Sequence, residues 1–250
     1  MQKQYLPGQW LDVYVPGVPK AGGFTIVSAP PLLTRKPVPQ SLPRSHHLEL
    51  AIQKSPKNPP AAWLWQDTEV IIGQELNVRV GGSFIWPPEL LRRGLKRVVF
   101  VAGGVGINPL ICMVTSIAEI KRVRGGDLGF DVRFLYTTRE LPEPKEILFL
   151  DRLVHIFKSL GASGDLKLFL TGSVASTKEE DKLIIDCTSI PVLRRRINDK
   201  DLINAIGGVE DRSGTCAYIC GIPGMTDEFV DKLKTAEGME EQNVLSEKWW

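Results

Sequence analysis

Apolar positions follow two different patterns along the chain, and the change falls near residue 95. Before it, short apolar runs are separated by prolines and glycines, and residues 74–80 alternate like a strand with one buried face. Eleven of the 18 prolines lie in residues 1–60, where helices are therefore hard to build. The predicted strands of this part are residues 10–15, 23–27, 47–52 and 74–80. This pattern predicts a turn-rich β-barrel or sandwich.

After residue 95, strand-like and helix-like patterns alternate. The predicted strands are residues 98–101, 132–136, 166–170, 217–220 and 243–246, and the predicted helices are residues 109–122, 146–160, 199–206 and 226–235. Such alternation indicates an α/β domain with a parallel sheet covered on both faces. We therefore expect two domains, residues 1–95 and 96–250, with a mobile charged insertion at residues 172–198 of the second.

Composition narrows the possible functions. Lys and Arg number 31 against 29 Asp and Glu, so the chain lacks the positive excess of a nucleic-acid-binding protein. No uninterrupted apolar run approaches the ~20 residues of a membrane-spanning helix. The four cysteines form no C-x-x-C pair and no H-E-x-x-H motif is present, so we expect no metal site, and reduced thiols in an intracellular compartment.

A glycine-rich turn, Gly103-Gly104-Val105-Gly106-Ile107-Asn108-Pro109, follows a predicted buried strand and opens a predicted helix. Glycines let a pyrophosphate approach the backbone, and a helix N-terminus favours its negative charge. The acidic residue that usually ends the next strand of a dinucleotide site is missing, because Tyr136 is followed by Thr137, Thr138 and Arg139. A tight turn without a ligand remains an equal alternative at this point.

Two further features lie near the end of the chain. Cys220-Gly221 ends a predicted strand, so in a parallel sheet it shares an edge with the glycine turn. A thiol at this edge can border a flat heterocycle, although a free cysteine is more often a small buried apolar residue. The chain closes on Trp249 and Trp250, whose rings cover either a flat cofactor or a gap between domains.

Taken in order, these motifs resemble the ferredoxin–NADP reductase superfamily, and most closely the oxidoreductase NAD-binding domain-containing proteins. The resemblance rests on the Pro-Gly-Gln strand at residues 7–9, the glycine turn at residues 103–109, the Cys-Gly-x-x-x-Met run at residues 220–225 and the terminal aromatics. It implies a flavin-binding β-barrel, lacking its first strands, followed by a Rossmann-like α/β domain. It also implies a mitochondrial location.

The resemblance implies hydride transfer from a nicotinamide nucleotide to FAD N5 and electron delivery to an unknown acceptor. The catalytic residues it implies are Thr25, Cys220 and Glu247. The cofactor-binding residues it implies are Phe24, Thr25, Ile26, Ala61, Ala62, Gly103, Gly104, Val105, Gly106, Ile107, Pro109, Thr138, Arg139, Cys220, Gly221, Met225, Trp249 and Trp250. NAD is favoured over NADP because residues 170–173 lack the arginine that usually holds a 2′-phosphate.

The barrel half departs from the family pattern at the flavin. Gly22 replaces the arginine that would neutralise the flavin pyrophosphate, and Phe24 replaces a tyrosine. Ala61 replaces a hydroxyl residue at the second phosphate site, which leaves the backbone amides of Ala61 and Ala62 as anion donors. Two alternatives therefore stay open: a nucleotide-binding protein of this fold that has lost FAD, and a non-catalytic partner whose barrel is completed by another chain.

Overall fold

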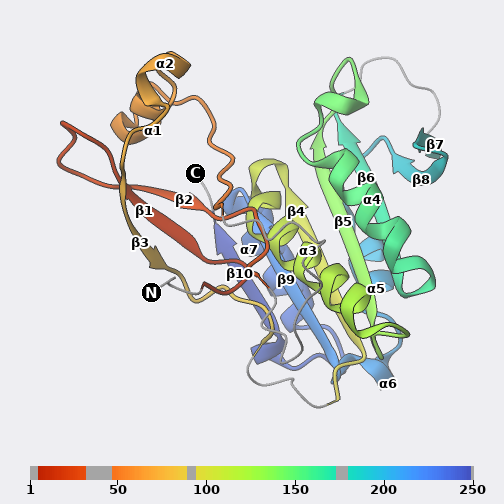
Figure 1. Cartoon of the computed structure of the whole chain (residues 1–250). Helices are drawn as coiled ribbons and strands as arrows, with labels where there is room; N and C mark the ends of the chain where they lie inside the picture. Colours follow the sequence, from red (N-terminus) through yellow and green to blue (C-terminus); the bar gives the residue numbers. More distant parts are fainter. Residues whose placement is uncertain (1–4, 32–46, 89–93, 173–179, 249–250) are drawn as a thin grey trace.

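The computed structural model describes residues 5–31, 47–88, 94–172 and 180–248. These residues form a small antiparallel sheet and a large, mostly parallel sheet (Figure 1). Trp249 and Trp250, the predicted aromatic cover, lie outside the described residues. Residues 173–179 of the predicted insertion lie outside them as well.

The small domain is built on three antiparallel strands in the order β2-β1-β3. They are β1 (Trp10–Tyr14), β2 (Gly22–Thr25) and β3 (Asn77–Gly81). Two short helices, α1 (Pro59–Leu64) and α2 (Thr68–Ile71), lie between β2 and β3 in the chain. The predicted strand at residues 47–52 is wrong, because only Leu50 forms a bridge, to Ile26. The backbone carbonyls of the next two residues accept hydrogen bonds from side chains and not from a neighbouring strand. The Asn108 side chain donates to the Ala51 carbonyl, and the Trp65 indole donates to the Ile52 carbonyl.

The large sheet has seven strands in the order β10-β9-β4-β5-β6-β8-β7. Its parallel strands are β4 (Arg97–Gly103), β5 (Asp131–Arg139), β6 (Gly164–Thr171), β8 (Thr188–Leu193), β9 (Thr215–Gly221) and β10 (Val244–Lys248). Strand β7 (Glu180–Ile185) runs antiparallel to β8 at the edge. The parallel sheet predicted from strand–helix alternation is confirmed.

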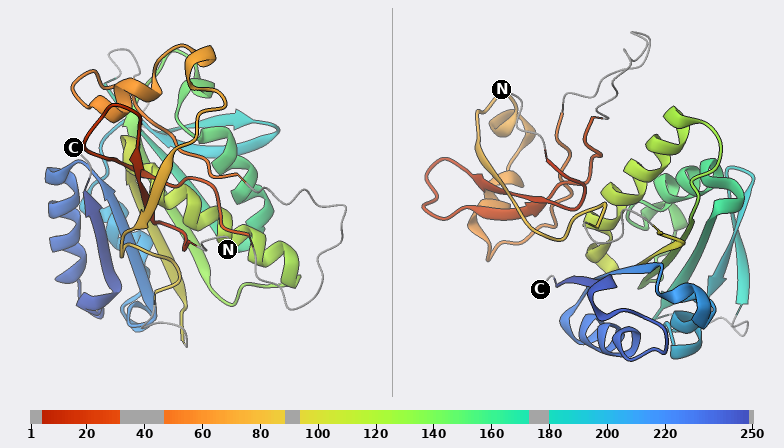
Figure 2. Two further views of the ribbon diagram at one scale, coloured as in Figure 1. Left: turned by 60° about the vertical axis from the view of Figure 1, so that its left-hand side comes forward. Right: turned by 90° about the horizontal axis from the view of Figure 1, so that it is seen from below.

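Helices cover both faces of this sheet (Figure 2). Val98 and Phe100 of β4 pack on the side of α3 (Ile107–Arg124) and α4 (Leu150–Leu160). Val99 and Val101 point the other way, towards α5 (Asp199–Ile206) and α7 (Pro223–Lys234), as alternation along a strand requires. The remaining short elements are α6 (Val209–Arg212) and the 3₁₀ turns η1 (Gly104–Gly106), η2 (Pro144–Glu146), η3 (Gly161–Ser163) and η4 (Glu241–Asn243).

Two predicted elements of the α/β domain differ from the structure. The helix predicted from residue 146 begins at Leu150, because Phe149 has a φ of 58° and a separate 3₁₀ turn precedes it. The charged insertion predicted to be mobile contains regular structure, since residues 180–193 form the β7–β8 hairpin and extend the sheet. Ile190 and Val192 are buried and alternate with the exposed Ser189 and Pro191, which anchors β8 on β6.

Helix α3 contacts both the large sheet and the small domain. The stretch Gly104–Arg124 is apolar and long enough to cross a membrane by length and composition, and 56% of its apolar window is buried within the protein. Its residues pack both on the large sheet and on the small domain: Cys112 lies in the small-domain core and donates its thiol hydrogen to the Ser28 carbonyl at 2.9 Å. Burial raises the pKa of Cys112 to about 12, so this group stays a thiol at neutral pH.

Further hydrogen bonds join the small domain to the large sheet. Tyr218 of β9 donates to the Ile85 carbonyl at 2.8 Å, and Arg152 of α4 pairs with Glu49 at 2.7 Å. The small domain therefore has a fixed place on the α3 face of the sheet, the face towards which Tyr218 and Cys220 point.

Candidate nucleotide-binding site

The carboxyl ends of β4, β5, β9 and β10 meet at one edge of the large sheet, where ligands of such sheets bind. Strand register places Cys220 beside Ala102 of β4 on one side and beside Glu247 of β10 on the other. Two of the three predicted catalytic residues, Cys220 and Glu247, are thus neighbours at this edge. Cys220 is fully buried and makes part of the core that includes Phe100 and Tyr218.

The glycine turn after β4 and the Cys220-Gly221 turn after β9 interlock. A Cβ atom built at Gly106 would overlap the carbonyl group of Cys220. A Cβ at Gly103 would lie 2.7 Å from Cε of Met225 and 3.5 Å from Cα of Gly221, and one at Gly221 would overlap the same methionine. Three of the glycines and Met225 are therefore explained by contact between the two turns, with or without a ligand.

Gly104 is different because a Cβ there would meet no atom within 4 Å, while its φ of 52° favours glycine. The following Val105 is 40% exposed. Helix α3 begins at Ile107 with Pro109 in its first turn, and no side chain caps its amino end. An open backbone beside an uncapped N-terminus of an 18-residue helix fits the pyrophosphate of a nicotinamide nucleotide.

An acidic residue does follow the second strand of this domain, although sequence reasoning missed it. Strand β5 continues to Arg139, three residues past its predicted end, so the residue at the sheet edge is Glu140. Arg194 donates to Oε1 of Glu140 at 3.2 Å and also pairs with Asp181 at 3.1 Å. Oε2 of Glu140 is buried and has no hydrogen-bond partner. The apolar alternation of residues 132–136, continued through Thr138, would have signalled the longer strand.

The predicted contacts Thr138 and Arg139 lie at the same edge. Thr138 has local partners: its side chain bonds with Tyr136, and its carbonyl accepts from the Thr171 hydroxyl at 3.2 Å. The exposed Arg139 forms no ion pair with any residue that the structure describes. Arg139, which has no ion-pair partner among the described residues, and Glu140, whose buried Oε2 accepts no hydrogen bond, are therefore neighbours at the end of β5.

The residues predicted to hold the flavin do not offer it phosphate contacts. A Cβ at Gly22 would lie 2.6 Å from Cε2 of Phe24 and 2.7 Å from Cβ of Pro60, so no larger side chain fits there. Helix α1 has six residues, and its first amides are already used. The Ala61 N–H donates to Oδ1 of Asn58 at 3.3 Å, and the Ala62 N–H donates to the Asn58 carbonyl at 2.8 Å. These residues do not fit a flavin pyrophosphate.

The remaining predicted flavin contacts are buried in the small domain. Phe24 and Ile26 belong to its apolar core, with 8% and 0% of their surfaces exposed. Thr25 is buried as well, and its hydroxyl forms no hydrogen bond with the described residues. Among the described residues, no group of three His, Cys, Asp or Glu side chains is placed to hold a metal ion.

No protein-family model matches the chain. Oxidoreductase NAD-binding domain-containing protein 1 of Xenopus tropicalis is 32% identical over 248 residues, which cover 97% of this chain and 69% of that protein. The human protein of the same name is 30% identical over 244 residues, covering 97% and 70%.

Among solved structures, the flavohem-like FAD/NAD-binding domain of nitric oxide dioxygenase from Vibrio cholerae superposes with a TM-score of 0.67. It covers 99% of this chain and 86% of its own at 18% identity, so it shows a shared fold: a flavin-type β domain followed by a Rossmann-like domain. The two close relatives go further than fold. The chain belongs to the oxidoreductase NAD-binding domain-containing protein 1 family.

Proposed function

We propose that the chain is an NAD(P)H-dependent oxidoreductase that binds its nicotinamide nucleotide across the carboxyl edge of the large sheet. The observation that carries this proposal is the open backbone at Gly104 beside the uncapped N-terminus of α3. The family relatives named for oxidoreductase NAD-binding domains support the same assignment.

In this proposal the chain positions the nucleotide. The turn at Gly104–Gly106 and the end of α3 bind the pyrophosphate. Gly221, which has no side chain, lets the nicotinamide approach the end of β9, where Cys220 and Glu247 lie on adjacent strands. When bound, the nicotinamide supplies a hydride, that is, two electrons and a proton. The buried Cys220 excludes water from this corner, and Glu247 orients the carboxamide side of the ring.

The small domain bears on the acceptor of that hydride. The family resemblance predicts FAD, but the positions that would hold its phosphates are occupied by Phe24, Pro60 and Asn58. The same observation favours a second candidate function: a nicotinamide-nucleotide-binding protein of this fold that does not bind FAD.

Anaerobic assays of the purified chain separate the two candidates. The first predicts that NADH raises the melting temperature and reduces ferricyanide or added FAD in the presence of the protein. The second predicts the same thermal shift with no reduction of either acceptor. If neither NADH nor NADPH changes the melting temperature, both candidates are wrong.

We also propose that NAD is preferred over NADP, because of Glu140. The Glu140 side chain is 26% exposed, so its carboxylate can accept a hydrogen bond from a ribose hydroxyl, and its negative charge repels a 2′-phosphate. Replacing Glu140 by Gln should lower the ratio of NADPH to NADH dissociation constants by about tenfold, which is ~1.4 kcal/mol. Glu143→Gln is the matched control, since Glu143 is exposed and pairs with Lys145. An unchanged ratio in Glu140→Gln would contradict the assignment.

A further inference from the structure

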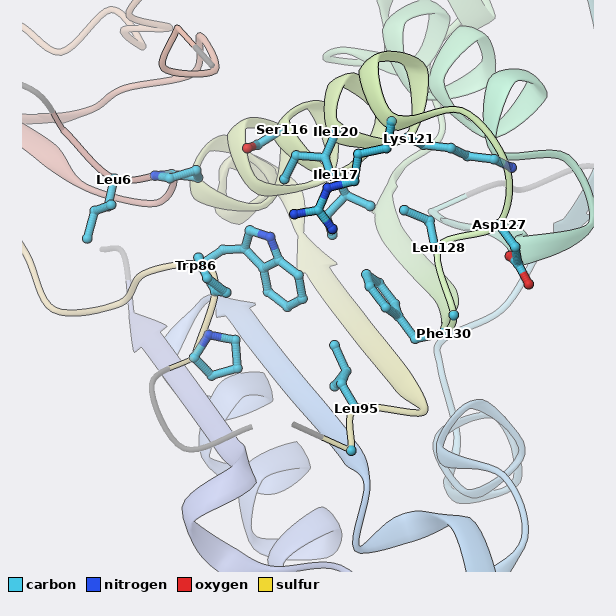
Figure 3. A pocket seen from close by; sticks show the side chains of 16 residues that line it. Leu6, Trp86, Leu95, Ser116, Ile117, Ile120, Lys121, Asp127, Leu128 and Phe130 are labelled. Atoms are coloured by element: carbon cyan, nitrogen blue, oxygen red, sulfur yellow. The ribbon is translucent and has the colours of Figure 1, made fainter. Parts of the chain in front are cut away.

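A pocket lies far from the proposed nucleotide site, at the amino ends of β4 and β5. Its volume is about 560 Å³, and it is bounded by the second half of α3, the segment at Trp86 and the residues that precede β4 and β5 (Figure 3). The nucleotide turn lies at the other end of β4, about 20 Å away for a strand of this length. The two sites therefore do not overlap.

The walls of this pocket are mainly apolar. Figure 3 shows Trp86, Ile117 and Phe130 around one space, with Leu95 and Leu128 at its margins. Trp86 is fixed by ring contacts to Phe130, Phe100 and Tyr218, with centroids 6.0, 6.4 and 6.0 Å away. A pocket of this volume with apolar walls suits a small organic molecule.

Two polar side chains line the pocket and have no protein partner. Trp86 and Ser116 are 4% and 5% exposed as whole residues. The indole N–H of Trp86 and the hydroxyl of Ser116 form no hydrogen bond with any described residue. Both groups are therefore available to donate to an acceptor on a ligand in the pocket.

The charged groups of the pocket favour an anion. Lys121 donates to the Leu160 carbonyl, and the exposed Arg124, one turn further along α3, forms no ion pair within the described part of the chain. The one acidic residue among the described lining residues is Asp127. Hydrogen bonds from Ser163 and from the backbone of Leu128 and Gly129 lower the pKa of Asp127, so it is a hydrogen-bonded carboxylate whose single negative charge faces the two cations Lys121 and Arg124.

We propose that this pocket binds a small apolar carboxylic acid that carries a second oxygen acceptor, such as an oxo acid. The carboxylate lies at Lys121 and Arg124, and the carbonyl oxygen accepts hydrogen bonds from Trp86 and Ser116. Ser116 and Arg124 are eight residues apart on α3, about 12 Å along the helix axis, and the arginine side chain shortens this span by reaching back towards the N-terminus. A chain of about eight carbon atoms bridges the two ends.

Calorimetric titration of the full chain tests this with four probes of equal chain length: octanoate, 7-oxooctanoate, octanol and octylamine. We expect the two acids to bind, 7-oxooctanoate about tenfold more tightly than octanoate, and octylamine to bind at least tenfold more weakly than octanoate. If octylamine binds as well as octanoate, or if no probe binds, the proposal is overturned.

Two variants assign the contacts. Arg124→Glu should weaken octanoate at least tenfold without changing octanol, whereas Arg122→Glu, an equally exposed position on α3 that does not line the pocket, should change neither. Ser116→Ala should abolish the preference for 7-oxooctanoate over octanoate. Equal effects of the two arginine variants would overturn the proposal. NADH affinity is measured in parallel and should stay unchanged, so a failure here is separate from a failure of the proposed function.

Discussion

Gly104 and Gly106 are two residues apart and are glycines for different reasons. Gly106 has no room for a side chain because the Cys220 carbonyl lies against it. Gly104 has room, but its φ of 52° is strained for other residues and its open side faces the proposed pyrophosphate site. Substitution by alanine at each position therefore separates packing from binding.

We expect Gly104→Ala to fold, with a free energy of unfolding lower by about 1 kcal/mol, and to bind NADH at least tenfold more weakly. Gly106→Ala should lower the free energy of unfolding by about 1–3 kcal/mol or more, because the added methyl group must displace backbone. Urea denaturation and NADH titration measure the two effects. Equal losses of stability with unchanged NADH affinity in Gly104→Ala would refute this distinction.

At this scale the sequence predicted some site residues and missed others. Cys220 and Glu247 were predicted from family motifs, and strand register does bring them together. Glu140 was missed because the predicted strand was ended at Tyr136, the last apolar residue, although Thr138 continues the alternation and β5 extends to Arg139. The use of the Ala61 amide by Asn58 depends on a side-chain rotamer, which sequence does not give.

Among the elements, helix α5 has the most complete capping. Asn198 and Asp201 form a reciprocal capping box, and Arg195 donates to both carboxylate oxygens of Asp201. Burial opposes ionisation of Asp201, but these hydrogen bonds and the charge of Arg195 outweigh it and lower the pKa of Asp201. The stabilisation is therefore complete above the ordinary aspartate pKa of ~3.9 and is lost as the pH falls through the lowered folded value.

Asp201→Asn should lower the free energy of unfolding by about 1 kcal/mol at pH 7, because the cap and the ion pair are weakened. The difference from the unchanged protein should shrink at pH 3. Asp199→Asn is the control, since Asp199 is 72% exposed and pairs with Lys232 at the surface. Urea denaturation at the two pH values measures both variants. A difference that grows towards pH 3 would contradict this account.

The order and type of the α/β elements could be predicted because buried strands and amphipathic helices each give a characteristic spacing of apolar residues in the sequence. The strand predicted around Leu50 failed for a tertiary reason: the Ala51 and Ile52 carbonyls are taken by Asn108 and Trp65. The sequence predicted a mobile insertion in place of the β7–β8 hairpin, because the charged residues of the hairpin obscure the alternation of buried and exposed positions around Ile190.

For the whole molecule, the position of the small domain depends on a few contacts with the large sheet. Tyr218→Phe removes the hydrogen bond to the Ile85 carbonyl and should lower the free energy of unfolding by about 1–3 kcal/mol. Tyr136→Phe is the matched control: Tyr136 is equally buried, but its hydroxyl contact, to Thr138, is local. Urea denaturation compares them. A larger loss in Tyr136→Phe would show that the interdomain bond contributes little.

Such contacts could not be predicted from the sequence, because they join residues more than a hundred positions apart. The pocket beside Trp86 is of the same kind, since it depends on how the small domain meets α3. The mitochondrial location and the role of the terminal tryptophans stay predictions.

The interlocked turns also bear on how such proteins are recognised in genomes. Gly106 would be required in any protein that kept these two turns, even one without redox chemistry, because an added Cβ would overlap the Cys220 carbonyl, while Gly103 and Gly221 leave room for the end of the Met225 side chain. A sequence search that takes all of these glycines as evidence of dinucleotide binding will therefore count too many proteins as enzymes. Gly104 is the more informative position, because packing between the two turns does not require glycine there and only its φ of 52° favours it.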